Sequence, residues 1–163
     1  MFNIRVYGIL INSQHQVLVS DELIRGMYVT KFPGGGLEKG EGTRDCLKRE
    51  FKEEMDLHVE INDHLYTTDF YQQSAFNPAD QIISIYYYAT PLETIKVPLR
   101  LKAFDFDDRQ MAVYASEKEI ETFRFVDLPQ FSDQTMTLPI DKVVANLIRK
   151  SKGLEESAGS SSL

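Results

Sequence analysis

The sequence contains a single cysteine, Cys46, so no disulfide can form within the chain. A lone thiol is typical of proteins that work in a reducing compartment, and we therefore expect a cytoplasmic protein. No apolar run approaches the roughly 18 residues that are needed to span a bilayer, which excludes a predicted membrane helix. The first residues also lack the basic stretch and long apolar run of a secretory signal.

The sequence has few basic residues: it contains 18 Lys and Arg but 25 Asp and Glu, which gives a formal net charge of −7. Proteins that bind nucleic-acid phosphates need clustered Lys and Arg, so we expect no nucleic-acid partner. An acidic site can still bind a small phosphorylated molecule when divalent cations lie between the two negative partners. The charge balance therefore still permits a small anionic substrate that is held through metal ions.

The length of 163 residues suits one domain with a modest core, and Val- and Ile-rich segments predict its strands. The turn-forming residues 12–15 predict a hairpin between the first two strands. The tyrosine run 86–88 should place at least one ring in the core, because side chains alternate between the two faces of a strand. The predicted strands cover residues 2–11, 16–19, 27–32, 57–61, 65–76, 81–90 and 123–126.

Two helices are predicted. Leu47, Phe51 and Met55 recur every four residues and predict an amphipathic helix from Thr43, the expected N-cap, to Met55. Pro139 marks the start of the second helix, which carries one apolar face. Many strands with two helices predict a mixed α+β fold. The small, polar C-terminal residues predict a mobile tail over 153–163 after a domain spanning 1–152.

Three acidic residues of the first helix, Glu50, Glu53 and Glu54, lie three and four positions apart and therefore share one face. Like charges at this spacing repel by a few tenths of a kcal/mol per pair. A site for hard divalent cations tolerates them, since carboxylate oxygens are the ligands that Mg²⁺ prefers. Arg49 lies four residues before Glu53 and could orient that carboxylate. Taken alone, these residues are more typical of a solvated acidic helix face than of a metal site.

The segment before this helix contains three consecutive glycines, Gly34, Gly35 and Gly36. A glycine-rich loop that leads into a helix lets the backbone approach a phosphate or a metal closely. The carbonyl of Gly34 could supply an oxygen ligand, and Glu41 brings a fourth carboxylate near the start of the helix. The combination of glycines and spaced carboxylates is far more specific than either feature alone.

The full spacing resembles the signature of the Nudix hydrolase family. It runs from Gly35 through Glu41 to Arg49-Glu50 and Glu53-Glu54, with Leu57 at its end, and Phe32-Pro33-Gly34 resembles the usual lead-in. One position departs, because Asp56 stands where the family has glycine. Glycine there serves a left-handed C-cap, which aspartate tolerates at a cost of about 1 kcal/mol.

This resemblance implies a Nudix-type α/β/α sandwich in which a mixed sheet carries a loop–helix–loop catalytic motif. It also implies hydrolysis of a phosphoanhydride (pyrophosphate) bond in a small nucleoside-diphosphate-linked substrate, with Mg²⁺ or alternatively Mn²⁺ as cofactor. A homodimer is expected by the same resemblance. The residues it implies are, for catalysis, Glu53, Glu50, Arg49 and Glu41, and for the metal, Glu50, Glu53, Glu54, Gly34 and Glu119. Our candidates for binding the substrate are Arg5, Lys31, Gly35 and Tyr71.

Several alternatives stay open at this stage. Either Glu53 or Glu50 is expected to act as the general base. Glu119 is preferred over its acidic neighbours 117 and 121, although all three also fit a solvated charge run. The competing function is a Nudix-fold ligand-binding or regulatory domain without strong catalysis. The intact carboxylate pairs favour the enzyme, since a sensor has less reason to retain them.

Overall fold

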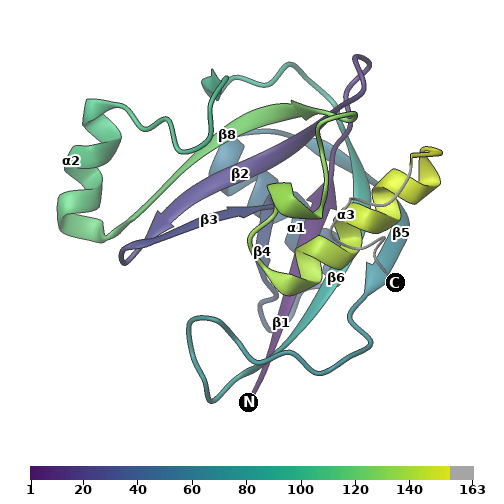
Figure 1. The fold of residues 1–163 in the computed structure, drawn as a ribbon. Coiled ribbons are helices and arrows are strands. Elements are labelled where there is room, and N and C mark those ends of the chain that lie inside the picture. Colours follow the sequence, from purple (N-terminus) through teal and green to yellow (C-terminus); the bar gives the residue numbers. More distant parts are fainter. Residues whose placement is uncertain (155–163) are drawn as a thin grey trace. The chain divides into compact units, whose positions relative to one another are not determined.

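The computed structural model describes residues 1–154 and divides the chain into two compact units. The first unit combines Met1–Ile11 with Pro33–Val97, and the second combines Asn12–Phe32 with Pro98–Leu163, of which residues 155–163 lie outside the described part. Each unit contains a four-stranded sheet of mixed strand direction (Figure 1). With three α-helices among the described residues, the predicted α+β class is confirmed. Across these residues no helix is both long and apolar enough to cross a membrane.

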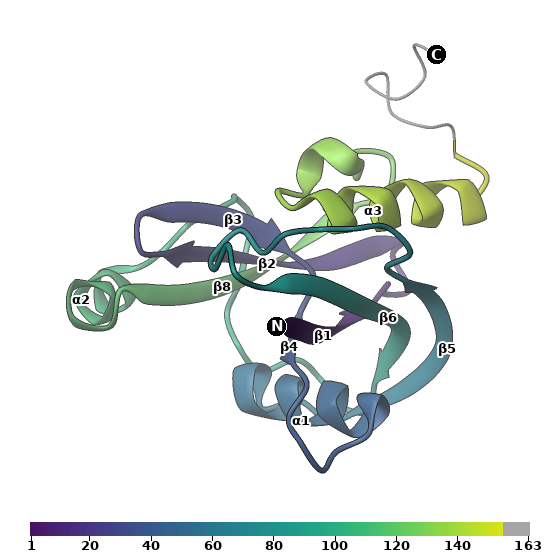
Figure 2. The ribbon, with the colours of Figure 1, turned by 90° about the horizontal axis from the view of Figure 1, so that it is seen from below.

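The sheet of the first unit has the strand order β4-β1-β6-β5. Strand β1 (Phe2–Ile9) lies at its centre, antiparallel to β4 (Gly34–Gly36) and parallel to β6 (Gln81–Pro91). Strand β5 (Val59–Thr67) closes the other edge antiparallel to β6. Helix α1 (Thr43–Met55) contacts β1, β4 and β5, and Figure 2 shows it along one side of this sheet.

Helix α1 packs through the apolar face that the sequence predicts, together with Cys46, which is also buried. The helix approaches β1 so closely that a Cβ on Gly8 would lie 2.6 Å from the ring of Phe51. The helix begins at Thr43, but its N-cap is Gly42, so the expected cap is wrong by one residue. The hydroxyl of Thr43 instead forms a 2.7 Å hydrogen bond with that of Tyr87.

The C-terminal end of α1 shows how the chain accommodates its departure from the family pattern. Asp56 adopts the left-handed conformation, with φ 48° and ψ 43°, as the C-cap. Its backbone N–H donates to the carbonyl of Lys52, and its side chain forms an ion pair with the ammonium of the same residue. The aspartate therefore keeps the helix stop that glycine would give, and it gains a partner for its charge.

The sheet of the second unit has the strand order β3-β2-β8-β7. Strand β2 (Gln16–Ile24) pairs antiparallel with both β3 (Met27–Lys31) and β8 (Glu119–Asp127), and β7 (Leu99–Arg100) runs parallel to β8. Helix α2 (Asp108–Glu117), the 3₁₀ turn η1 (Asp133–Thr135) and helix α3 (Pro139–Ser151) complete this unit. The predicted start of α3 at Pro139 is confirmed.

Two strand predictions are wrong. Strands β1 and β2 belong to different sheets and form no hairpin, although residues 12–15 do turn the chain. The turn signal specifies a change of direction, whereas the partner of each strand depends on residues far away in the sequence. The strand expected over 65–76 ends at Thr67, and its later aromatic residues lie exposed. Their side chains follow no alternation of buried and exposed positions, so the β-forming composition of this segment was misleading.

Candidate active site

Two of the three glycines of β4 are required, each for a different reason. A Cβ on Gly34 would lie 2.1 Å from the backbone oxygen of Val6, and Gly34 has a φ of +146° that disfavours other residues. A Cβ on Gly35 would lie 2.5 Å from the carboxylate of Glu50. A Cβ on Gly36 would meet nothing closer than 3.7 Å. Glycine at position 35 therefore makes room for the Glu50 carboxylate directly against the backbone of β4.

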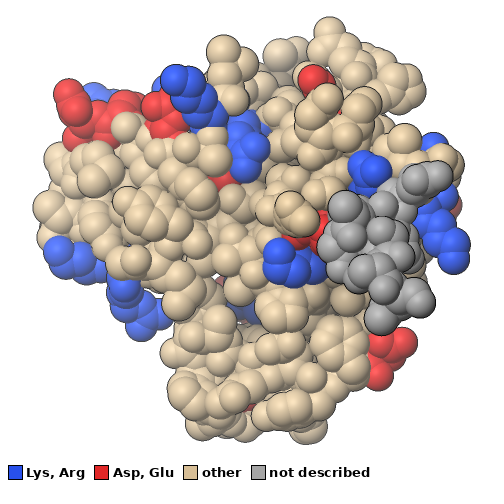
Figure 3. Space-filling model, in the orientation of Figure 1, with Lys and Arg blue, Asp and Glu red and all other residues tan. Residues whose placement is uncertain are grey.

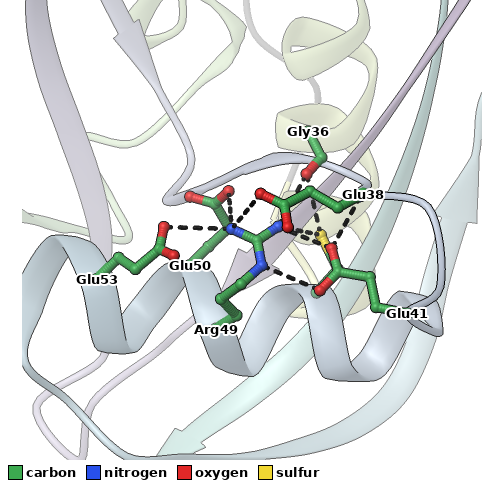
Figure 4. A network of polar contacts seen from close by, with 7 residues as sticks. Gly36, Glu38, Glu41, Arg49, Glu50 and Glu53 are labelled. Carbon is green, nitrogen blue, oxygen red and sulfur yellow. Dashed lines mark hydrogen bonds and ion pairs between the residues drawn. The ribbon is translucent and has the colours of Figure 1, made fainter.

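Arg49 lies at the centre of a network that joins α1 to the loop before it (Figure 4). Its guanidinium donates to both carboxylate oxygens of Glu41, over 2.7 and 3.0 Å, and to the carbonyl oxygen of Gly36 over 3.0 Å. Its Nη1 donates to Glu50 over 2.9 Å and to Glu53 over 3.2 Å. A planar guanidinium suits such bidentate contacts, which fix orientation as well as charge. The sequence-predicted residues Glu41, Arg49, Glu50 and Glu53 are thus brought together.

The network shifts the protonation of its members. Hydrogen bonds from Arg49, and then from the backbone N–H of Glu38, hold the pKa of Glu41 at about 2. The same contact with Glu41 raises the pKa of Arg49 above its ordinary value. Burial, followed by the hydrogen bond with Glu41, raises the pKa of the Cys46 thiol to about 12. Glu41 is therefore an anion and Cys46 a neutral thiol throughout the physiological range.

The acidic residues of α1 differ in exposure. The side chain of Glu50 is 12% exposed, whereas that of Glu53 is 59% exposed. Within residues 1–154 no three His, Cys, Asp or Glu side chains form a group that could hold a metal ion, and at this site the carboxylates turn toward Arg49 instead. The donor set of carboxylates and backbone carbonyls nevertheless suits Mg²⁺ in kind. The exposed Glu53 has room to rotate, and the space beside Gly35 already accepts a carboxylate, so these residues fit such an ion.

Two candidates for binding the substrate lie elsewhere in the first unit. Arg5 pairs with Gly36 across β1 and β4, and its Nε donates to the hydroxyl of Tyr7 over 2.6 Å. Since Gly8 faces α1 and side chains alternate along a strand, Arg5 points away from that helix. Tyr71 is 70% exposed on the loop between β5 and β6. The structure therefore places neither side chain in the network around Arg49.

The remaining candidates, Lys31 and Glu119, belong to the second unit. Lys31 is buried at the end of β3, where its ammonium lies 2.8 Å from the carboxylate of Glu22. Glu119 begins β8 opposite Ile24 and is exposed. Two residues further on, burial, reinforced by the charge of Glu22, raises the pKa of Glu121, although Lys31 opposes the shift. Glu22 could not be singled out from the sequence, because Ser20 and Asp21 directly precede it and the strand mixes polar and apolar residues.

Comparison with known proteins assigns the chain to a family. The family model of the NUDIX domain matches residues 1–147, and the chain belongs to this family. The expected enzyme class, a Nudix-type pyrophosphohydrolase, is confirmed at the level of the family. No curated protein sequence matches the chain significantly.

Solved structures support the fold. A NUDIX hydrolase from Nitrosomonas europaea superposes with a TM-score of 0.64 at 13% identity, covering 98% of this chain and 95% of the other. The MutT protein from Methanosarcina mazei Go1 gives a TM-score of 0.62 at 17% identity, with 93% and 96% covered. An ADP-ribose pyrophosphatase from Streptococcus suis gives 0.55 at 14% identity, with 95% and 96% covered. At these identities the likeness establishes the shared fold alone.

Proposed function

We propose that this protein is a Mg²⁺-dependent hydrolase that cuts a phosphoanhydride bond in a small nucleoside-diphosphate-linked substrate. The observation that carries the proposal is the network in which Arg49 holds Glu41, Glu50 and Glu53 beside the glycines of β4. Similar proteins include a MutT protein and an ADP-ribose pyrophosphatase, and the second name describes this type of reaction. On the face drawn in Figure 3, the described Lys and Arg side chains are scattered among neutral and acidic residues, as suits a small-molecule substrate.

The metal would be held by Glu50, Glu53, Glu54 and the carbonyl of Gly34. When bound, Mg²⁺ supplies positive charge that offsets the negative charge of the phosphates as the bond breaks. Glu53 accepts the proton of the attacking water, since its side chain is exposed and contacts Arg49 at the longer distance of 3.2 Å. Glu50 is the alternative base, but its carboxylate is confined between Arg49 and Gly35.

The other residues position these carboxylates. The two contacts between Arg49 and Glu41 keep the guanidinium in place, so the carboxylates that it contacts lose little freedom when substrate binds. Arg5 and Tyr71 are proposed to contact the substrate beyond the scissile bond. Glu119 is proposed as a further metal ligand. A homodimer and a cytoplasmic location are part of the same proposal, and sedimentation velocity tests the first.

Replacing Glu53 or Glu54 by Gln tests the function. We expect each variant to lose at least about 10²-fold in Mg²⁺-dependent hydrolysis of nucleotide sugars, dinucleotides or nucleoside triphosphates, while its circular dichroism spectrum is unchanged. Glu60→Gln is the matched control, because Glu60 is exposed on β5 and outside the network, and it should keep full activity. Full activity in Glu53→Gln or Glu54→Gln, or an inert wild type across the whole panel, would contradict the proposal.

A further inference from the structure

The guanidinium of Arg49 has more acceptors around it than it has N–H groups. A guanidinium carries five N–H donors. Arg49 donates five hydrogen bonds to oxygen, which end on Glu41 (two), Gly36, Glu50 and Glu53. Glu38 lies beside the same group, with a carboxylate oxygen 3.7 Å from Nη1 (Figure 4). Since that distance is too long for a hydrogen bond, Glu38 is an additional acceptor that Arg49 does not use in this structure.

The backbone holds Glu38 in its place. Its N–H donates to Oε1 of Glu41 over 2.9 Å, and its carbonyl oxygen accepts from the N–H of Glu41 over 3.4 Å. The side chain of Glu38 is 68% exposed and therefore has room to move. Closing the 3.7 Å gap to an ordinary hydrogen-bond length requires a shift of less than about 1 Å. Glu38 can thus reach Nη1 of Arg49 without a rearrangement of the loop.

Of the two carboxylates that Nη1 contacts, Glu53 is the one that can leave. Its contact is 3.2 Å long and its side chain is 59% exposed, against 2.9 Å and 12% for Glu50. Glu50 is also confined by the backbone at Gly35. When Glu53 turns toward a metal ion, one N–H of Arg49 loses its acceptor. The Arg49 side chain is only 22% exposed, so leaving that N–H without an acceptor costs free energy.

We propose that Glu38 is a positioning residue that accepts the N–H of Arg49 that Glu53 releases on binding a divalent metal ion, an inference that rests on the proposed function. In the metal-free protein the carboxylate of Glu38 adds little to stability, because its contact is long and exposed to solvent. In the metal-bound protein it keeps every N–H of Arg49 paired. Glu38 therefore favours metal binding and not folding.

The first test compares metal affinity with stability. Isothermal titration calorimetry with Mn²⁺ and no substrate measures the affinity, and calorimetric unfolding of the metal-free protein measures the stability. We expect Glu38→Ala to weaken Mn²⁺ binding roughly three- to fivefold and to leave the metal-free midpoint unchanged. Glu38→Gln should fall between Glu38→Ala and the wild type, because its amide oxygen still accepts a hydrogen bond but carries no charge.

Asp45→Asn is the matched control. It removes one negative charge from an exposed residue in the first turn of α1, so it reports any general effect of charge on cation binding. We expect its affinity for Mn²⁺ to equal that of the wild type. An affinity loss in Asp45→Asn as large as that in Glu38→Ala would overturn the inference. Wild-type affinity in Glu38→Ala would do the same.

The second test needs no metal and separates positioning of Arg49 from direct metal ligation by Glu38. In Glu53→Ala one N–H of Arg49 has lost its acceptor before any metal binds. Glu38→Ala in that background should therefore lower the metal-free unfolding midpoint by about 1–4 °C, although it has no such effect in the wild type. Equal effects of Glu38→Ala in both backgrounds would contradict the exchange of acceptors.

The inference and the proposed function fail in different ways. A wild type that binds Mn²⁺ but hydrolyses no compound of the substrate panel refutes the proposed function, and the comparison of affinities still decides the role of Glu38. A wild type that binds no Mn²⁺ overturns the inference. An active wild type whose affinity for Mn²⁺ does not depend on Glu38 supports the function and refutes the inference alone.

Discussion

The guanidinium of Arg49 and the carboxylate of Glu41 form a two-point contact, with Nη2 to Oε1 at 2.7 Å and Nε to Oε2 at 3.0 Å. The two residues lie eight positions apart, one in the loop and one on α1. Glu41 also accepts a hydrogen bond from the backbone N–H of Glu38, so the contact ties the whole loop to the helix. The geometry of the site therefore depends on a residue outside the proposed metal ligands.

This contact predicts a dependence of stability on pH. Because the pKa of Glu41 is about 2 in the folded protein and 4.5 for an ordinary Glu, the unfolded chain binds more protons between these values. The stabilisation by Glu41 is therefore complete above pH 4.5 and is lost as the pH falls toward 2. Urea unfolding of the wild type and Glu41→Gln should show a constant difference in unfolding free energy at neutral pH. That difference should shrink in acid, whereas a difference independent of pH would refute the assignment.

Local features of the fold could be predicted from the sequence, whereas strand partners could not. The apolar spacing of Leu47, Phe51 and Met55 defines α1 from Thr43 to Met55, because helical burial repeats over a few residues. The pairing of β1 with β6 joins residues about 80 positions apart and leaves no local signature. Helix α2 was not predicted. None of its residues is buried, so its sequence has no helical repeat of apolar residues that would indicate a helix.

Within the site, too, contacts along one helix could be predicted from the sequence, whereas contacts between different elements could not. Spacing on one helix predicted that Arg49 would meet Glu53, and the structure confirms that contact at 3.2 Å. The contact between Gly35 and Glu50 joins β4 to α1. Only the structure reveals that a Cβ at position 35 would lie 2.5 Å from the Glu50 carboxylate, which is why the position requires glycine. Lys31 was expected to bind the substrate, and its burial against Glu22 could not be inferred from either residue alone.

The glycines of β4 give a matched series of substitutions. Gly35→Ala should displace the Glu50 carboxylate and lower kcat by at least about tenfold, while stability changes little because the obstructed atoms belong to a side chain. Gly36→Ala meets nothing closer than 3.7 Å and should keep most of the activity. Steady-state kinetics and thermal unfolding of the two variants make the comparison. Equal activity in both variants would show that the position of Glu50 is unimportant for the reaction.

The substitution Gly8→Ala is expected to change the stability of the protein rather than its catalytic activity. An alanine Cβ there would lie 2.6 Å from the ring of Phe51, which is fully buried in the interface between α1 and β1. Overpacking of this kind costs about 1–3 kcal/mol. For a protein of this size, that cost lowers the unfolding midpoint of Gly8→Ala by roughly 2–4 °C per kcal/mol. Differential scanning calorimetry measures the shift, and a midpoint equal to that of the wild type would mean that the helix moves freely away from the strand.

The single thiol supplies an independent check on the packing of α1. Cys46 is buried, and its Sγ lies 3.5 Å from the carbonyl oxygen of Gly36. Because burial raises the pKa of this thiol to about 12 from its ordinary value of 9.0, the thiolate fraction at pH 8 falls by about 10³-fold. Iodoacetamide should therefore label the native protein at least about 10²-fold more slowly than the urea-unfolded chain. Cys46→Ser is the control for specificity and should take up no label in either state. Rapid labelling of the native wild type would mean that α1 separates from β4 often enough to expose the thiol, and a site that depends on their contact would then be only partly formed.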